Sequence, residues 1–229
     1  MEIHGLQKLT LLDWPGKVVC TVFLGGCDFR CPFCQNSGLI TGPIPGIIPE
    51  DEFFSFLSKR RGLLDGVCIT GGEPLLRPDL AEFLNRIKAL GYPVKLDTNG
   101  NHPKQLISLW KKGLIDYVAM DIKNCPERYA ETAGIAELSL AAVQESVEWL
   151  LSGLIEYEFR TTIVRQFHND KDMIRIGQWI RGAKQYYLQG FVKSSRVLTS
   201  GHEPYSRDEL ERLLSLVQPY VAAVELRGC

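Results

Sequence analysis

Three cysteines lie within eight residues near the start of the chain, in the run CDFRCPFC at positions 27–34. The C-x3-C-x2-C spacing lets the three thiolates converge on one inorganic centre. Iron–sulfur cubanes normally take four thiolates, so three leave one iron without a protein ligand. An iron with an open coordination position is a place where substrate chemistry can occur. The spacing therefore predicts a [4Fe–4S] cluster held by Cys27, Cys31 and Cys34.

A structural zinc site is the alternative interpretation of the same cysteines, because zinc also takes Cys and His ligands. Zinc would need a fourth ligand nearby, whereas all four histidines are distant in sequence: His4, His102, His168 and His202. A disulfide framework is less favoured than metal chemistry, because three of the seven cysteines are clustered so closely.

Polar residues also follow three later stretches that have the character of strands. The first motif is Gly71-Gly72-Glu73-Pro74. Paired glycines allow close backbone approach, and a carboxylate there can meet a cationic amine. By itself such a motif is more often only a turn.

The second motif contains Asp97 and Thr98, and the third contains Asp121 and Lys123. The second also fits an Asx turn. Alternation along a strand places Asp121 and Lys123 on the same side, where a local ion pair is the simpler alternative.

The elements that must position these residues alternate between strand and helix. Strands are predicted at 17–24, 66–70, 93–97, 116–121, 157–164, 190–194 and 220–226. Periodic apolar residues predict helices around 80–87, 143–151 and 210–217, with weaker helices at 50–61, 103–112 and 170–181. Six strand–helix pairs and a final strand fall short of eight pairs. We therefore expect an α/β fold, a partial (β/α)6-type barrel of parallel strands.

Length and charge limit the remaining possibilities. The 229 residues suit one domain, 1–229, in which a Gly-, Pro- and Cys-rich loop at about 25–49 holds the cysteines. Lys plus Arg is 26 and Asp plus Glu is 27, so no nucleic-acid partner is expected. The chain has neither a signal-peptide pattern nor an apolar run of membrane-spanning length. We therefore expect no membrane association and a cytoplasmic location.

The cysteine array, placed just after a predicted strand, resembles the signature of radical S-adenosylmethionine enzymes. The resemblance implies that the free iron of the cluster is chelated by the amine and carboxylate of S-adenosylmethionine. It also implies reductive cleavage of that cofactor to a 5′-deoxyadenosyl radical. The fold implied is a full or partial (β/α) barrel, which agrees with the strand count.

Further motifs resemble the activating enzymes of glycyl radical enzymes. These are DWPGK at 13–17 and FLGGC at 23–27. Within that group the resemblance is greatest to anaerobic ribonucleoside-triphosphate reductase activating proteins, which VELRG at 224–228 also resembles. A plain structural account of the first motif is a Pro-Gly turn into a strand.

The resemblance implies roles for individual residues. The cofactor-binding candidates are Gly71, Gly72, Glu73, Pro74, Asp97, Thr98, Lys123 and Arg160. Among these, the Gly-Gly-Glu-Pro motif would bind the cofactor amine and Lys123 its carboxylate. Asp97 and Asp121 can hold a monovalent cation. Arg160 has the alternative of covering apolar surface with its stem.

The sequence departs from the pattern at Gln35-Asn36, where many activating enzymes have His-Asn. No histidine is assigned to the cofactor, and His168 and His202 are interpreted as loop residues. No catalytic residue is assigned apart from the cluster and cofactor.

The four other cysteines are expected to have no role in a cluster. Cys20 and Cys68 lie in apolar strands, where a thiol behaves as a small buried hydrophobe, and Cys125 and Cys229 are isolated.

The functional hypothesis is an activating enzyme whose 5′-deoxyadenosyl radical abstracts a hydrogen atom from a glycine of a partner glycyl radical enzyme. The partner expected is an anaerobic ribonucleoside-triphosphate reductase. A flavodoxin or ferredoxin would supply the electron. The alternatives are a radical enzyme acting on a small molecule, similar to 7-carboxy-7-deazaguanine synthase, and a non-catalytic zinc-binding module.

Overall fold

The computed structural model describes residues 1–41 and 46–228, which divide into two compact units. The first unit contains Met1–Asp28, Gly38–Thr98 and His102–Val118; the second contains Phe29–Ser37, Asn99–Asn101 and the chain from Ala119 onward. The predicted cysteine loop at 25–49 includes 42–45, which lie outside the described residues, as does Cys229. That the whole chain forms one domain stays a prediction.

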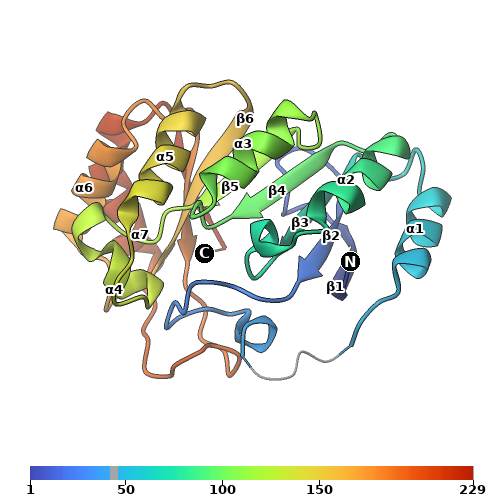
Figure 1. Cartoon of the computed structure of the whole chain (residues 1–229). Helices are drawn as coiled ribbons and strands as arrows, with labels where there is room; N and C mark the ends of the chain where they lie inside the picture. The colour runs from blue at the N-terminus through green and yellow to red at the C-terminus, as the bar shows by residue number, and fades with distance from the viewer. Residues whose placement is uncertain (42–45, 229) are drawn as a thin grey trace. The chain divides into compact units, whose positions relative to one another are not determined.

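The first unit contains a sheet that follows chain order. Its strands are β1 (Ile3–Thr10), β2 (Val19–Leu24), β3 (Gly66–Gly71) and β4 (Val94–Thr98), and its helices are α1 (Glu50–Lys59), α2 (Leu80–Ala89) and α3 (Pro103–Lys111), as Figure 1 labels them. β1 pairs antiparallel with β2, whereas β2, β3 and β4 are parallel. Parallel pairing requires crossover connections, which the helices provide.

Strand β3 shows why this sheet needs cover on both faces. Val67, Cys68 and Ile69 are consecutive and completely buried. Successive side chains of a strand point to opposite faces, so apolar groups are packed on each side. Part of the cover is aromatic, because Phe53 of α1 stacks on Phe83 of α2 with ring centroids 5.4 Å apart.

The second unit also keeps its strands in chain order. It contains the end of β5 (Tyr117–Asp121), then α4 (Tyr129–Ala133), α5 (Leu140–Leu151), β6 (Glu156–Ile163), α6 (Asp170–Trp179), β7 (Tyr186–Gly190), α7 (Arg207–Val217) and β8 (Val224–Arg227). β6, β7 and β8 are parallel. The helices α6 and α7 begin at capping boxes, Asn169 with Asp172 and Ser206 with Glu209.

A buried ion pair ties the last strand to the unit. Arg227 of β8 donates to both carboxylate oxygens of Glu158 on β6, at 2.8 and 3.0 Å. Glu158 is completely buried, and the Arg227 guanidinium also lies over the Tyr187 ring at 3.3 Å. The pair therefore connects three strands and supplies the countercharge that a buried carboxylate requires.

The α/β class, the mainly parallel strands and all six predicted helices are confirmed. The seven predicted strands become eight among the described residues, because β1 was missed. Only Ile3 and Thr10 of β1 are buried, so its sequence lacks the alternation that marks a strand. The short helix α4 was also not predicted.

Two strand boundaries were wrong. The strand predicted at 190–194 is β7, which ends at Gly190, and Val192 beyond it is 57% exposed. The strand predicted at 220–226 begins only at Val224 because Gln218–Tyr220 continues α7 as a 3-10 helix. In both places the pattern of apolar residues does not mark where the strand begins or ends.

None of the helices in the described part of the chain is long and apolar enough to cross a membrane.

Candidate functional site

The predicted site residues are distributed over both units, and each group is described within its own unit. The first unit holds Cys27, Gly71–Pro74, Asp97 and Thr98; the second holds Cys31, Cys34, Asp121, Lys123 and Arg160. Among the described residues no three His, Cys, Asp or Glu side chains form a ready-made ion site. The three-cysteine ligand set therefore stays a prediction.

In the first unit, the Gly-Gly-Glu-Pro motif is attached to the start of the cysteine loop. The Gly72 amide donates to the Leu24 carbonyl at 2.9 Å, and the Glu73 amide donates to the Gly26 carbonyl at 2.8 Å. A Cβ atom on Gly72 would lie 1.9 Å from the Gly26 oxygen and 3.3 Å from Cys27 Cβ. Only glycine permits this approach, so the end of β3 fixes the backbone that leads into Cys27.

Glu73 connects that motif with the end of β4. Its side chain is completely buried, and its Oε1 accepts from the Leu75 amide at 3.1 Å and from the Thr98 hydroxyl at 2.9 Å. Two of the predicted cofactor residues are thus brought together by one hydrogen bond. A carboxylate has about four lone-pair positions, so Glu73 held in this way can also accept from an ammonium group of a ligand.

Asp97, the other predicted site residue of β4, forms an ion pair with a lysine of the same strand. Lys95 Nζ lies 2.6 Å from Asp97 Oδ1. The Lys95 side chain is 0% exposed and the Asp97 side chain 13% exposed. This carboxylate is therefore neutralised by a side chain two residues earlier.

Sequence reasoning missed a histidine beside the first cysteine. His102 Nε2 lies 2.9 Å from Asp28 Oδ2, and the Cys27 thiol lies 4.0 Å from Asp28 Oδ1. The hydrogen bond to Asp28 raises the pKa of His102, and the Asp28 and Glu73 charges act in the same direction. No spacing rule could have found this pair, because 74 residues separate its members.

In the second unit, the middle of the cysteine loop rests on the end of α4 and on the segment after β7. The Arg30 amide donates to the Ala133 carbonyl at 2.9 Å, and the Thr199 amide donates to the Pro32 carbonyl at 2.8 Å. Gly134 has φ +68°, and a Cβ there would lie 2.1 Å from the Arg30 oxygen. The loop thus has tertiary anchors on either side of Cys31.

The two predicted cluster ligands of this unit, Cys31 and Cys34, share a turn. The Cys34 amide donates to the Cys31 carbonyl at 3.0 Å. Burial raises the pKa of the Cys31 thiol to about 11, and the Lys123 ammonium opposes that rise. A cation beside a thiol favours the thiolate that iron requires.

Asp121, Lys123 and Arg160 form one charged group. Asp121 Oδ2 lies 3.1 Å from Lys123 Nζ, and its Oδ1 accepts from Arg160 Nε at 2.9 Å. Burial acts to raise the pKa of Asp121, but the two cations lower it to about 2. Burial likewise disfavours the Lys123 ammonium, whereas Asp121 and Cys31 raise its pKa overall. All three side chains are therefore charged at neutral pH.

His168 holds the backbone of Lys123 through a hydrogen bond to its carbonyl group. Its ring is fully buried, its Nδ1 accepts from the Val164 amide at 3.1 Å, and its Nε2 donates to the Lys123 carbonyl at 2.9 Å. Burial lowers the pKa of His168, which keeps this neutral tautomer. The ring also contacts Phe33, between the two cysteines, at 6.4 Å between centroids. The sequence correctly placed His168 in a loop, but not its burial or its contacts.

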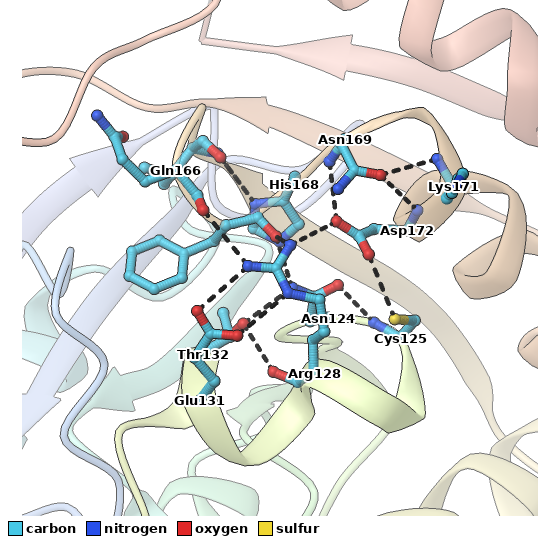
Figure 2. A network of polar contacts seen from close by, with 12 residues as sticks. Asn124, Cys125, Arg128, Glu131, Thr132, Gln166, His168, Asn169, Lys171 and Asp172 are labelled. Atoms are coloured by element: carbon cyan, nitrogen blue, oxygen red, sulfur yellow. Dashed lines mark hydrogen bonds and ion pairs between the residues drawn. The ribbon is translucent and has the colours of Figure 1, made fainter.

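A polar network fixes the loop that carries His168 (Figure 2). Arg128 donates to the Phe167 carbonyl and to Asp172 Oδ2, both at 2.7 Å. Asn124 donates to the same carbonyl and to the Thr132 hydroxyl, both at 2.8 Å. The segment after β5 is thereby attached to the segment after β6.

The burial predicted for Cys20 and Cys68 is observed, and that the remaining cysteines have no role in a cluster stays a prediction. Cys20 and Cys68 are completely buried in β2 and β3, and Cys125 is 1% exposed with its thiol 3.7 Å from Asp172 Oδ1. None of the six described cysteines forms a disulfide bond with another described cysteine.

Comparison with known proteins identifies the family. A model described as the radical SAM superfamily matches residues 21–180. A Methanocaldococcus jannaschii protein provisionally named a glycyl-radical enzyme activating enzyme is 31% identical over 195 residues, which cover 82% of this chain and 79% of that protein. The chain belongs to the radical S-adenosylmethionine superfamily. Membership implies a [4Fe–4S] cluster and S-adenosylmethionine as cofactors.

Two other relatives match a smaller part. A 7-carboxy-7-deazaguanine synthase of Koribacter versatilis is 30% identical over 149 residues, covering 63% of this chain and 61% of the synthase. A pyruvate formate-lyase-activating enzyme of Listeria monocytogenes is 30% identical over 139 residues, covering 56% of each chain.

The fold is also found in a solved structure. SuiB of Streptococcus suis superimposes with a TM-score of 0.71 at 16% identity, over 92% of this chain. The match spans about half of the SuiB chain, 49%. At this identity the likeness shows the shared fold.

The chain's own residues fit the implied cofactors. Cys31 and Cys34 present two thiols from one turn beside the Lys123 cation, and the glycines of β3 fix the backbone at Cys27. Glu73 offers a buried carboxylate to an amine, and Lys123 and Arg160 offer cations to a carboxylate. These roles are predictions from the sequence with which the geometry of each unit is compatible.

The close backbone approach at Gly72 is tested by Gly72→Ala. We expect a loss of about 1–3 kcal/mol in the free energy of unfolding, because the new Cβ must displace the Gly26 carbonyl. Urea denaturation of the reduced apoprotein measures it. Gly38→Ala, in the cysteine loop that Gly72 contacts, is the control, since a Cβ there meets nothing within 4 Å. Equal losses for the two variants would contradict the steric argument.

The network of Figure 2 is tested by Asp172→Ala. We expect a loss of about 2–3 kcal/mol, because the substitution removes one of the two carboxylate partners of Arg128 and half of the α6 capping box. Thermal and urea unfolding measure the change. Arg175→Ala, which removes an exposed ion pair with Glu127, serves as control and is expected to cost at most about 1 kcal/mol.

The charge of Asp121 predicts an acid-dependent loss of stability. Its pKa is about 2 in the folded protein and about 4 when unfolded, so its contribution is present above about pH 4 and disappears as the pH falls toward 2. Urea titrations at several pH values should give Asp121→Asn a shallower decline than the wild type in this window. The exposed Asp51→Asn on α1 should decline as the wild type does. A wild-type slope retained in Asp121→Asn would refute the assignment.

Proposed function

We propose that this chain activates a glycyl radical enzyme. The observation that carries the proposal is the extent of its likeness to the M. jannaschii protein, which covers 82% of the chain. Sequence motifs outside the cysteine array, DWPGK at 13–17 and VELRG at 224–228, support the same conclusion. They also favour an anaerobic ribonucleoside-triphosphate reductase as the partner. A flavodoxin or ferredoxin is proposed as the reductant.

The proposed reaction combines cofactor chemistry with binding by the protein. When bound, the reduced cluster would supply one electron to break the sulfonium C–S bond of S-adenosylmethionine, giving methionine and a 5′-deoxyadenosyl radical. That radical would take a hydrogen atom from a partner glycine, giving 5′-deoxyadenosine and a glycyl radical. Thiolates of Cys27, Cys31 and Cys34 would hold three irons. Glu73 would accept from the cofactor amine, and Lys123 would donate to its carboxylate. Gly71, Gly72, Pro74, Asp97, Thr98 and Arg160 would shape the pocket.

The protein's part is orientation and electrostatics. His168 holds the backbone of Lys123, and Arg160 and Asp121 limit where its ammonium can lie. A fixed ammonium meets a ligand carboxylate without the entropy loss of ordering a free side chain. We propose a cytoplasmic location, because a reducing compartment would keep Cys27, Cys31 and Cys34 available as thiolates for the cluster.

A second function, radical chemistry on a small molecule, is favoured by the 30% identity to the 7-carboxy-7-deazaguanine synthase. This small-molecule function differs from the activating function in two observable ways. It predicts sustained turnover without a protein partner, and a requirement for magnesium.

The test begins with anaerobic reconstitution, reduction with dithionite and addition of S-adenosylmethionine. We expect an iron–sulfur chromophore, release of 5′-deoxyadenosine, and a glycyl-radical EPR signal when the reductase partner is added. Cys31→Ala should lose the cluster, whereas Cys20→Ala, at a buried thiol of β2, should keep it. An intact cluster without cleavage would disprove the radical function. Cleavage without a glycyl radical on any candidate partner would disprove the activating function, and a colourless zinc protein would favour the binding-module alternative.

A further inference from the structure

Lys95 is a lysine whose side chain is completely enclosed in the first unit. A buried ammonium is costly unless a countercharge and hydrogen bonds replace its water. Asp97 supplies the countercharge, at 2.6 Å from Nζ. The two residues are two apart on β4 and therefore point to the same face of the strand. The pair is thus built into the strand.

The surroundings of Lys95 are acidic as well as apolar. Register pairs Thr21 with Cys68 and Cys68 with Lys95, so these three side chains share a face of the sheet. The Thr21 hydroxyl donates to Asp13 Oδ2 at 2.6 Å. Burial raises the pKa of the Cys68 thiol, with Lys95 opposing and Asp97 and Asp13 adding to the rise. The Lys95 ammonium and the carboxylates of Asp97 and Asp13 thus all act on the same buried thiol.

Asp121 shows the same arrangement within the second unit. It is bound by Lys123 at 3.1 Å and by Arg160 at 2.9 Å. The resemblance stated above implies a monovalent cation at Asp97 and Asp121, yet each carboxylate already has a side-chain cation. A metal ion on Asp97 would have to share this carboxylate with the Lys95 ammonium, which lies 2.6 Å from Oδ1, and would be repelled by its charge. The residues present do not fit that ion.

We propose that the Lys95 ammonium is the resident cation of Asp97 and that this chain binds S-adenosylmethionine without a monovalent metal ion. The inference rests on the proposed cofactor-binding role of Asp97. A tethered ammonium has no translational freedom to lose, whereas a free ion must be captured from solution. The position of the Asp97 carboxylate then does not depend on the salt present.

The first measurement compares Na+, K+ and tetramethylammonium chlorides at equal ionic strength. For the reconstituted wild type we expect the dissociation constant of S-adenosylmethionine to change by less than about twofold among the three salts. Equilibrium retention of radioactive rubidium by the apoprotein gives a readout without cofactors, and we expect none above background. A need for Na+ or K+, or retention of about one rubidium ion per chain, would overturn the proposal.

The second measurement removes the ammonium. Lys95→Met leaves Asp97 without its resident cation, so rubidium binding should appear, and cofactor affinity should fall about tenfold in tetramethylammonium and recover in K+. Lys95→Arg keeps the charge and should stay independent of salt. Lys88→Met is the matched control, because Lys88 pairs with Asp116 at 2.7 Å outside the site. It should respond to salt as the wild type does.

The outcomes remain distinguishable. A folded Lys95→Met protein with equal affinity in every salt and no rubidium binding would overturn the role of Lys95. If Lys95→Met does not fold, the wild type and Lys95→Arg still decide whether a metal ion is needed. If no variant cleaves S-adenosylmethionine with an intact cluster, the proposed function fails, whereas rubidium retention still tests the cation.

Discussion

The structure depends on pairing charges that are removed from water. Lys95 with Asp97, Arg227 with Glu158, and Asp121 with Lys123 and Arg160 each combine opposite charges within one unit. An unpaired charge in such a place would be unstable, so each pair restricts both partners to one geometry. Two of these groups contain residues proposed to bind the cofactor. The same requirement that keeps the strands folded therefore holds the candidate binding groups in position.

Backbone contacts impose a second constraint, on the cysteine loop. The loop is largely irregular and has few internal hydrogen bonds, such as that from the Cys34 amide to the Cys31 carbonyl, so contacts with neighbouring segments must also fix it. Gly72 in the first unit and Gly134 in the second let neighbouring backbone approach Gly26 and Arg30 more closely than any side chain would allow. The amide groups of Glu73 and Arg30 then complete the attachment. These contacts explain how a long loop can present thiols from defined positions.

Histidines show how supporting residues extend the candidate site. His102 binds the carboxylate that follows Cys27, and His168 binds the carbonyl of Lys123. Neither is a predicted ligand of iron or cofactor. Each acts on a residue next to one, in the manner by which outer groups orient the inner ligands of a metal site. A radical reaction needs such order, because a misplaced radical attacks the nearest C–H bond.

The sequence by itself determined the chemistry and the class of fold. Cysteine spacing is local, and helix periodicity and capping are local, so Cys27, Cys31 and Cys34, the six main helices and the α/β class could be predicted. The boundaries of β7 and β8 could not be predicted, because they depend on which residues pair with the neighbouring strand in the folded sheet. Lys95 reads as an ordinary strand residue, and His168 as a loop histidine. Only the tertiary structure decided that Lys95 is buried beside Asp97 and that His168 is buried against the Lys123 carbonyl. The physical reason is that burial and contacts between distant segments are properties of the folded chain.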